Sequence, residues 1–203
     1  MTHQEIVNKV KDILNEHGEV DALSISDDRV QLENYIAVAI PDAVVMLASK
    51  GYRVNAVEFA KRNTSNHNID LPTDFISLVS IKLGKWKKAV TKITEVGSPE
   101  YNMAMNPYTA PGVNSPMCYK QGWTLVCIPD LPVGSGYDAF KLECNVKYNP
   151  YNDKGRVDPM FVIGAEEKEA TAVCYMAAAL VLGMFGDDQG KQRLSDISTN
   201  LLN

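Results

Sequence analysis

The chain has 203 residues, of which 45% are hydrophobic and 22% charged, a composition that supports one sizeable hydrophobic core and argues against a disordered protein. The formal net charge is −5 and the sequence isoelectric point is about 5.2. This acidic balance disfavours a dedicated DNA-binding protein, because affinity for polyphosphate comes from neutralisation by Lys and Arg.

Helices are expected in residues 1–70, the N-terminal helical region. Thr2 and Glu5 have the spacing of a capping box, in which each side chain accepts a hydrogen bond from the backbone of the other residue. Apolar residues then recur at helical spacing until Gly18. The sequence therefore predicts a short first helix.

A second helix is expected between Ser26 and Gly51, where apolar residues again recur on one face. Pro41 lies inside it, and a proline removes a backbone donor and crowds the preceding turn. The sequence therefore predicts a kinked helix or two shorter helices that meet near Ile40. Residues 52–59 are expected to add a further turn or short helix.

From Leu71 onward the hydrophobic period changes, and residues 71–164 are expected to form a β-domain. Apolar side chains between Phe75 and Leu83 alternate as in a strand. Pro72 cannot donate to a sheet ladder and favours an extended residue before it. Leu71 and Pro72 are therefore predicted to mark a strand entrance at a sheet edge.

Two further patterns extend the β prediction. The segment MCYKQGWTLVCI, from Met117 to Ile128, is typical of a hairpin around Gly122. The segment FKLECNVKY, from Phe140 to Tyr148, alternates apolar and polar side chains. Short strands without intervening helices are typical of an antiparallel sandwich or barrel.

Two long irregular stretches, residues 101–116 and 149–164, are rich in prolines and other turn formers. Long loops often carry binding function, so both are candidate interfaces, although an ordered loop packed on itself is an equally good interpretation of the first. The candidate interface residues are Tyr101, Pro107, Tyr108, Pro111, Val113, Tyr151, Met160 and Phe161.

Residues 165–203 are expected to form C-terminal helices that pack with the N-terminal ones. Glu166, Glu167 and Glu169 suit the start of an alanine-rich helix that Gly183 and Gly186 end, and Asp187 or Asp188 can cap a last helix. The predicted fold class is therefore α+β, with N- and C-terminal helices flanking a central antiparallel β-sandwich or barrel with long loops.

No catalytic, cofactor-binding or metal-ligating residue is predicted. His3, His17 and His67 have no Cys, Asp or Glu at ligand spacing. The chain also contains no phosphate-binding loop, dinucleotide-binding glycine motif or nucleophile elbow. We therefore expect neither a metal nor a cofactor, and no enzymatic activity.

Four carboxylates in the β-region, Glu95, Glu100, Asp130 and Glu143, are candidates for the acid and base of a glycoside hydrolase. Their separation in space cannot be read from the sequence. Solvated surface acids are the favoured interpretation, because acidic side chains are mostly exposed.

Four lysines, Lys82, Lys85, Lys87 and Lys88, surround Trp86. The lysines could contact DNA phosphates while the tryptophan stacks on a base. Lysines are also common at exposed strand edges, where they prevent pairing with another chain. Protection of an edge is the favoured interpretation.

The four cysteines, Cys118, Cys127, Cys144 and Cys174, form no C-x-x-C pair, and three of them lie in strand-like runs. Buried reduced thiols are predicted. No run approaches the ~18 consecutive apolar residues of a membrane span, and the first residues do not resemble a secretory signal. We therefore expect synthesis in a cytoplasm and no membrane association.

The order of these parts resembles the head-to-tail adaptor, or connector, proteins of short-tailed bacteriophages, including the tail tubular protein A type and the ring proteins of crAss-like phages. The resemblance covers most of the chain after Ile69. Its motifs are LPTDF from Leu71, SPMCYKQGWTLVCIP from Ser115, LECNVKYNP from Leu142 and EATAVCYMAAALVLGMFGD from Glu169.

The resemblance implies a virion protein, made in the cytoplasm of the bacterial host, that forms a ring of twelve copies below the portal. Its partners would be further copies of itself, the portal protein and a downstream tail or second ring protein, and DNA would pass the lumen without sequence-specific binding. Two alternatives stay open: a β-sandwich that binds a glycan or small ligand through Trp123, and a tail accessory enzyme that cuts cell-wall polymer.

Overall fold

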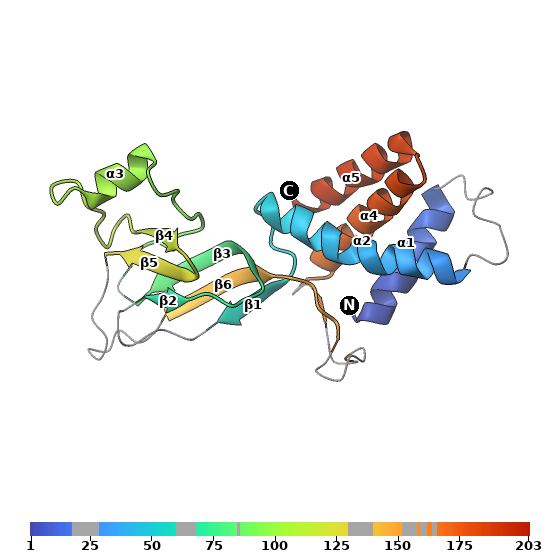
Figure 1. Ribbon diagram of the computed structural model, residues 1–203, viewed down its shortest axis with the longest axis horizontal. Coiled ribbons are helices and arrows are strands. Elements are labelled where there is room, and N and C mark those ends of the chain that lie inside the picture. Colours follow the sequence, from blue (N-terminus) through green and yellow to red (C-terminus); the bar gives the residue numbers. More distant parts are fainter. Residues whose placement is uncertain are drawn as a thin grey trace. The chain divides into compact units, whose positions relative to one another are not determined.

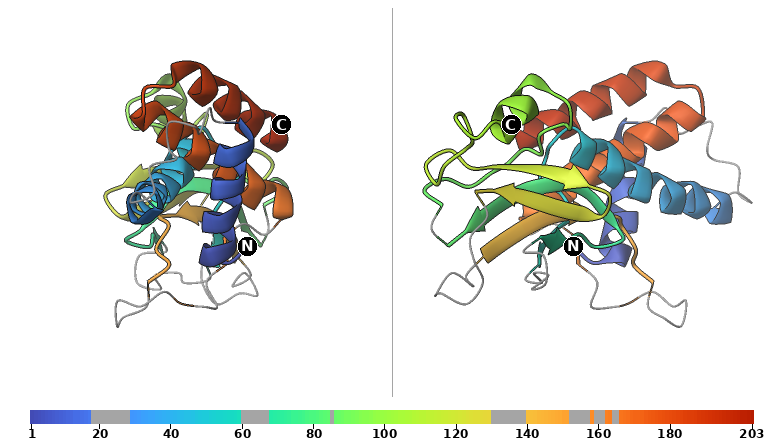
Figure 2. Two further views of the ribbon diagram at one scale, coloured as in Figure 1. Left: turned by 90° about the vertical axis from the view of Figure 1, so that its right-hand side faces the viewer. Right: turned by 60° about the vertical axis from the view of Figure 1, so that its left-hand side comes forward.

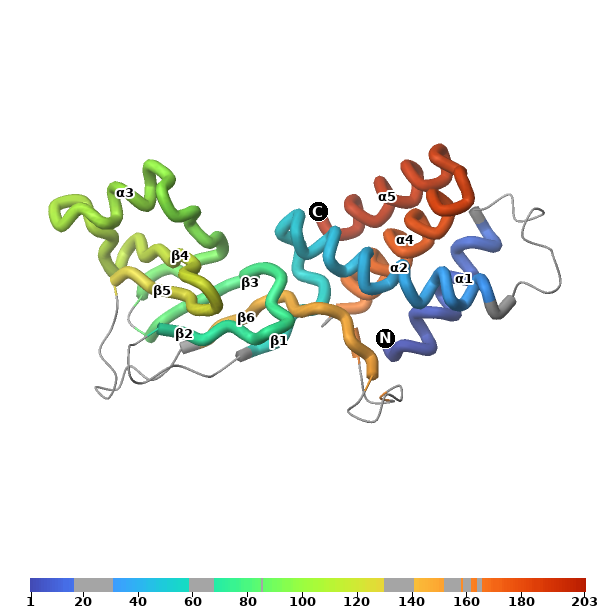
Figure 3. The backbone as a smooth tube through the Cα atoms, in the orientation of Figure 1, coloured from blue at the N-terminus to red at the C-terminus, as the bar shows by residue number. Residues whose placement is uncertain are grey.

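The computed structural model describes residues 1–17, 29–59, 68–84, 86–129, 140–151, 158, 162–163 and 166–203. The chain divides into two compact units (Figure 1). The helical unit contains Met1–Asn55 and Lys147–Asn203, and the β unit contains Ala56–Val146. The chain leaves the helical unit after its second helix and returns after the last strand, so both termini belong to the helical unit (Figure 3).

Four long helices make up the described part of the helical unit: α1 (His3–His17), α2 (Arg29–Ser49), α4 (Glu167–Met184) and α5 (Asp188–Leu202). α4 packs against the other three (Figures 1 and 2). Its alanines allow close approach of neighbouring helices, and Ala172, Ala177 and Ala178 are completely buried. α4 is therefore the central helix of this unit.

Local capping signals in the sequence correctly predicted two helix starts. The backbone N–H of Thr2 donates to Glu5 Oε2 over 2.8 Å, and the N–H of Glu5 donates to Thr2 Oγ1 over 3.4 Å. At the start of α5, the N–H of Gly190 donates to Asp187 Oδ1 over 2.8 Å. These contacts satisfy backbone donors that a helix start otherwise leaves without an intrahelical acceptor.

Of the two alternatives predicted for Pro41, two shorter helices are excluded, because α2 is one continuous helix that contains this proline. One prediction for the N-terminal region was wrong. Residues 56–59, predicted as part of a turn or short helix, form strand β1 (Ala56–Phe59). Ala56 pairs with Asn145 and Glu58 with Glu143. The strand's hydrogen bonds therefore come from a distant segment, which a local pattern cannot show.

α2 carries apolar side chains on its buried side and also on its exposed side, where Gln31, Asn34 and Asp42 lie as well. Its segment Gln31–Ser49 is, among the described residues, the one stretch long and apolar enough to cross a membrane on length and composition alone. A core helix passes the same test. In this structure one side of α2 packs on α4, with Ile36, Ile40 and Leu47 completely buried.

The described strands of the β unit form two open, antiparallel, three-stranded sheets and no barrel, so the barrel alternative was wrong. The first sheet has the order β1-β6-β3, with β6 at Phe140–Val146 and β3 at Phe75–Leu83. The second has the order β2-β5-β4, with β2 at Ile69–Asp70, β5 at Thr124–Ile128 and β4 at Met117–Gln121.

The two sheets share one hydrophobic cluster. Leu78 and Ile81 enter it from β3, Leu142 from β6 and Leu125 from β5. Trp86 is 2% exposed and lies in the same cluster. The α+β fold class is thus confirmed, with a small two-sheet unit between segments of the helical unit.

The segments LPTDF and KQGWT form turns of the β unit. The N–H of Leu71 donates to the carbonyl of Trp123 over 2.9 Å, and the N–H of Phe75 donates to the carbonyl of Pro72 over 3.1 Å. Pro72 therefore lies in the turn before β3, which is an edge strand of its sheet. In the predicted hairpin, Gly122 has φ +61°, a conformation that glycine adopts without steric cost.

Candidate interface surfaces

The first predicted loop begins with a helix that the sequence analysis missed. α3 spans Pro99–Met105, so residues 101–105 are helical. Ser98 caps it, because its Oγ accepts a hydrogen bond from the N–H of Tyr101 over 3.2 Å. Pro99 occupies the first turn, where its missing N–H removes no intrahelical hydrogen bond.

One side of α3 is anchored on the β unit. The ring of Tyr101 meets that of Tyr119 on β4 edge to face, with centroids 5.1 Å apart, and Ala104 is buried. Burial and the neighbouring Tyr101 raise the pKa of Tyr119. Further along, Val113 packs against the hydrophobic cluster, and its carbonyl accepts from the N–H of Lys87 over 2.8 Å. Tyr101 and Val113 therefore hold the loop in place.

Hydrogen bonds within the loop also order the turn after α3. The N–H of Tyr108 donates to Asn106 Oδ1 over 3.0 Å, and Thr109 Oγ1 donates to the carbonyl of Met103 over 2.5 Å. This turn presents the Tyr108 side chain to solvent, where it is 97% exposed. The loop is thus packed on itself and still exposes a large aromatic ring.

Four exposed apolar side chains lie in α3 or close to it along the chain, and we call Val96, Met103, Met105 and Tyr108 the α3 surface. Met103 is 60% exposed. Of the predicted interface residues in this loop, Pro107 is exposed next to Tyr108 and Pro111 is half-buried. Val96, Met103 and Met105 were missed. The Ser98-Pro99 helix start could have found the two methionines, because it places them in a short helix rather than a loop.

The second predicted loop lies largely outside the described residues, and Met160 and Phe161 are among those not described. Tyr151 is described and half exposed, and its N–H donates to Asn149 Oδ1 over 3.2 Å.

The exposed side of α2 forms a second apolar surface, which the sequence analysis did not select. Tyr35, Val38, Val45 and Met46, which we call the α2 surface, are spaced so that they share the side of the helix opposite to its buried residues. The ring of Tyr35 also meets that of Phe185, at the end of α4, edge to face with centroids 5.2 Å apart. Val38 is 59% exposed.

The structure excludes Trp86 as a platform for a nucleic-acid base. Its ring is buried in the hydrophobic cluster, and its Nε1 donates to the carbonyl of Pro129 over 3.2 Å. Lys82, Lys87 and Lys88 are exposed, whereas Lys85 lies outside the described residues. Lys82 belongs to the edge strand β3, the position at which a lysine hinders pairing with another chain.

Trp123 lies in the turn between β4 and β5 and is 59% exposed. The Nζ of Lys120 is 5.0 Å from the centre of its ring, a cation–π contact. Of the four acid–base candidates, Glu95 and Glu100 are exposed near the start of α3, and Glu143 is half-buried on β6. Asp130 lies outside the described residues.

All four cysteines are buried and free, as predicted. Among the histidines, His3 is described with its side chain, whose Nδ1 lies 2.6 Å from the hydroxyl of Tyr148. Burial lowers the pKa of His3. Within the described ranges, no group of three or more His, Cys, Asp and Glu side chains could hold a metal ion.

Substitution of Ser98 by alanine is expected to unfold α3 locally and leave the rest of the β unit folded. A helix of seven residues gains little from its own hydrogen bonds, and loss of an N-cap costs about 1 kcal/mol. Hydrogen exchange of the backbone amides of residues 101–105 should accelerate about fivefold, a factor that corresponds to this cost. The Ser115→Ala variant is the matched control. Unchanged exchange in the Ser98 variant would show that the Tyr101–Tyr119 contact alone holds the helix.

Comparison with known proteins gives no family for this chain. No protein-family model matches it. No curated protein matches it at a significant level either.

Proposed function

We propose that this protein is a structural virion component that forms a head-to-tail adaptor ring beneath a bacteriophage portal. In this role it lines the DNA channel and joins the capsid vertex to the tail. Copies of the chain contact one another around the ring, the portal lies above, and a tail or second ring protein lies below. The proposal combines the sequence resemblance with two exposed surfaces of the subunit.

The observation that carries the proposal is the presence of two different apolar surfaces, one in each unit. The α2 surface and the α3 surface each expose several large apolar side chains. Such groups of exposed apolar side chains are typical of protein–protein contacts. A cyclic ring needs two different contact patches on every subunit, because each copy meets its neighbours through unlike faces. Two such surfaces are what a ring subunit requires.

The charge of the chain supports the channel role. The formal net charge of −5 opposes tight retention of DNA, which carries dense negative charge. In the proposed ring, acidic residues dominate the lumen and DNA slides past them without sequence-specific contacts. The exposed Lys87 and Lys88 face outward or contact a partner.

Ring assembly of the purified chain, alone and with the portal protein, tests the proposal directly. Val38→Glu and Met103→Glu each introduce a charge into one apolar surface, and each is expected to weaken assembly by at least about tenfold. Leu201→Glu, at an exposed apolar position of α5 outside both surfaces, is the control. Mass photometry measures assembly, and circular dichroism shows that each variant is folded.

The adaptor role also requires that the chain be present in the virion. Mass spectrometry of density-purified particles from the producing culture measures this. The chain should be present at a small whole-number ratio to the portal subunit. A chain that is abundant in cells and absent from particles, or Glu variants that assemble like the Leu201 control, would overturn the adaptor role.

An exposed aromatic ring favours one other candidate, a glycan-binding module. Trp123 is exposed at a hairpin turn, as tryptophans in sugar-binding sites are, although Lys120 lies over its ring. Saturable quenching of tryptophan fluorescence by soluble glycans, abolished in a Trp123→Ala variant, would support that candidate against the adaptor. Trp86 provides the unresponsive reference because it is buried.

A further inference from the structure

Two buried thiols of the β unit face each other across adjacent strands. Cys118 on β4 is directly opposite Cys127 on β5 in the antiparallel register. Their Sγ atoms are 3.4 Å apart, and the two residues are 0% and 3% exposed. Both belong to the cluster that the two sheets share. The proposed adaptor role assigns no task to these two cysteines.

The backbone at this position suits a disulfide. Directly opposite residues of an antiparallel pair have Cα atoms about 4.5–5.5 Å apart. Disulfides are accommodated when the Cα atoms are about 4.4–6.8 Å apart, so the strands need not separate or slide. The sulfur atoms need only approach from 3.4 Å to bonding distance, a change that side-chain rotation within the pair can supply.

We propose that Cys118 and Cys127 are a latent cross-strand disulfide, reduced in the folded protein as made and closed when the protein meets a peroxide. The bond would fix β4 to β5 and so fix the hairpin that presents Trp123. It is a modification site independent of the adaptor role.

The chemistry needs only the two thiols and the peroxide. One thiolate attacks a peroxide oxygen, the O–O bond breaks, and the sulfur becomes a sulfenic acid while hydroxide leaves. The second thiol then attacks this sulfur, the S–S bond forms, and the sulfenic oxygen leaves as water with the proton of the thiol. In sum the protein loses two electrons and two protons, and the peroxide is reduced to two molecules of water.

The other two cysteines have a different neighbourhood and provide internal references. Cys144, on β6, lies opposite Val57 and Leu78, and burial raises its pKa to about 11. Cys174 lies in α4 of the helical unit, and burial raises its pKa to about 11 as well. Neither strand neighbour of Cys144 is a thiol. A sulfenic acid at Cys144 therefore has no thiol directly opposite it on either neighbouring strand. A sulfenic acid at Cys174 has no partner thiol within the helical unit, because the other three cysteines belong to the β unit.

The pair should react slowly at neutral pH and faster as the pH rises. The hydrogen bond to Cys127 and burial both raise the pKa of Cys118, so the reactive thiolate is scarce and its fraction grows with pH. β4 is the outer strand of its sheet, and at Cys118 its edge is paired with Thr94, whose N–H donates to the Cys118 carbonyl over 2.8 Å. A peroxide therefore reaches the pair when this edge opens locally. A reducing cytoplasm would therefore keep the pair as thiols.

The test is peroxide treatment of the folded, full chain, followed by denaturation, alkylation of remaining thiols and peptide mapping. The expected product links the Cys118 and Cys127 peptides, forms about tenfold faster than any oxidation of Cys144 or Cys174, and reverts with dithiothreitol. The link should persist in Cys144→Ser and disappear in Cys118→Ser.

Three results would overturn the proposal. The first is a pair that stays reduced at alkaline pH while the chain unfolded in urea becomes oxidised. The second is sulfinic acid at either position without a crosslink, and the third is linkage to Cys144 or Cys174.

Discussion

Replacement of Trp86 by alanine is expected to lower the free energy of unfolding of the β unit by about 3–5 kcal/mol. The ring is 2% exposed, lies in the cluster shared by the two sheets, and donates to the carbonyl of Pro129. Truncation removes the buried apolar surface, leaves a cavity and takes a donor from that carbonyl.

The second tryptophan provides the matched control. Trp123→Ala makes the same chemical change at a side chain that is 59% exposed, and its effect is expected to stay within about 0.5 kcal/mol. Urea unfolding followed by circular dichroism measures both variants, with hydrogen exchange of β6 to identify the transition of the β unit, because two compact units can unfold separately. Equal losses for the two variants would contradict the buried position of Trp86.

Elements with strong local signals could be predicted from the sequence alone. The Thr2–Glu5 capping box, the Asp187 cap and the alternation of Phe140–Val146 each contain their own hydrogen-bonding or burial pattern within a few residues. These elements were found at the expected places. The hairpin around Gly122 belongs to the same class, because a tight turn needs a residue that tolerates positive φ.

Short elements that depend on distant partners could not be predicted from the sequence. β1 has four residues, and its ladder is made with β6, far along the chain. Nothing within residues 52–59 shows that partner, so a helical interpretation was as consistent with the local pattern. α3 is also short, and the prolines around it indicated a loop, although the Ser98-Pro99 pair is a helix start.

The exposure of the candidate interface residues could be predicted only in part. Tyr108 and Pro107 are exposed as an interface requires, whereas Tyr101 and Val113 pack inward and hold the loop. The α2 surface was missed for a different reason. The many apolar residues of α2 indicate burial, and the sequence does not show which side of the helix lacks a neighbour. The structure identifies the exposed side of α2, because α4 covers the opposite side of this helix.

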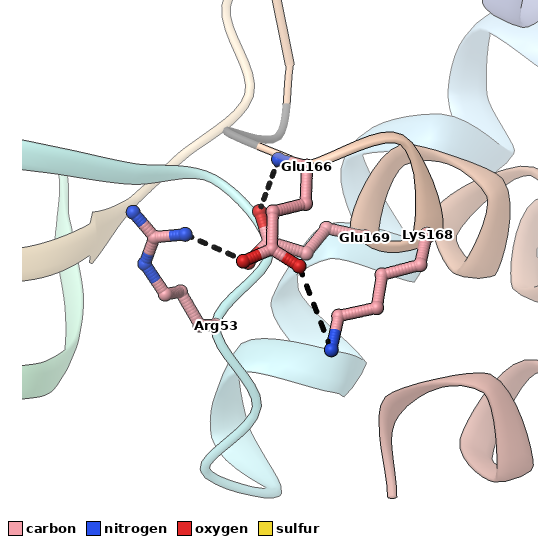
Figure 4. Close-up of polar contacts among 4 residues, drawn as sticks. All are labelled: Arg53, Glu166, Lys168 and Glu169. Carbon is pink, nitrogen blue, oxygen red and sulfur yellow. Dashed lines mark hydrogen bonds and ion pairs between the residues drawn. The ribbon is translucent and has the colours of Figure 1, made fainter.

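The ion pair at the start of α4 is expected to be the second large contribution to stability. Arg53 Nη1 lies 2.8 Å from Glu169 Oε1, and the other carboxylate oxygen accepts from the N–H of Glu166 over 3.2 Å (Figure 4). The Glu169 side chain is 5% exposed. A buried carboxylate needs a cation and hydrogen bonds to offset the loss of its hydration. Arg53 therefore stabilises both α4 and the segment that leads out of α2.

Arg53→Met keeps the apolar stem of the side chain and removes its charge, and we expect it to lower the free energy of unfolding of the helical unit by about 2–3 kcal/mol. Lys168→Met is the control, because Lys168 pairs with Glu166 over 3.5 Å at an exposed position, where such a pair contributes about 0–1 kcal/mol (Figure 4). The double variant Arg53→Met/Glu169→Gln should recover part of the loss, since a neutral amide costs less to bury than a carboxylate. A thermodynamic cycle of urea unfolding measures this coupling. Small and equal losses for Arg53→Met and Lys168→Met, without recovery in the double variant, would mean that the charge of Arg53 contributes no more to stability than that of an exposed lysine.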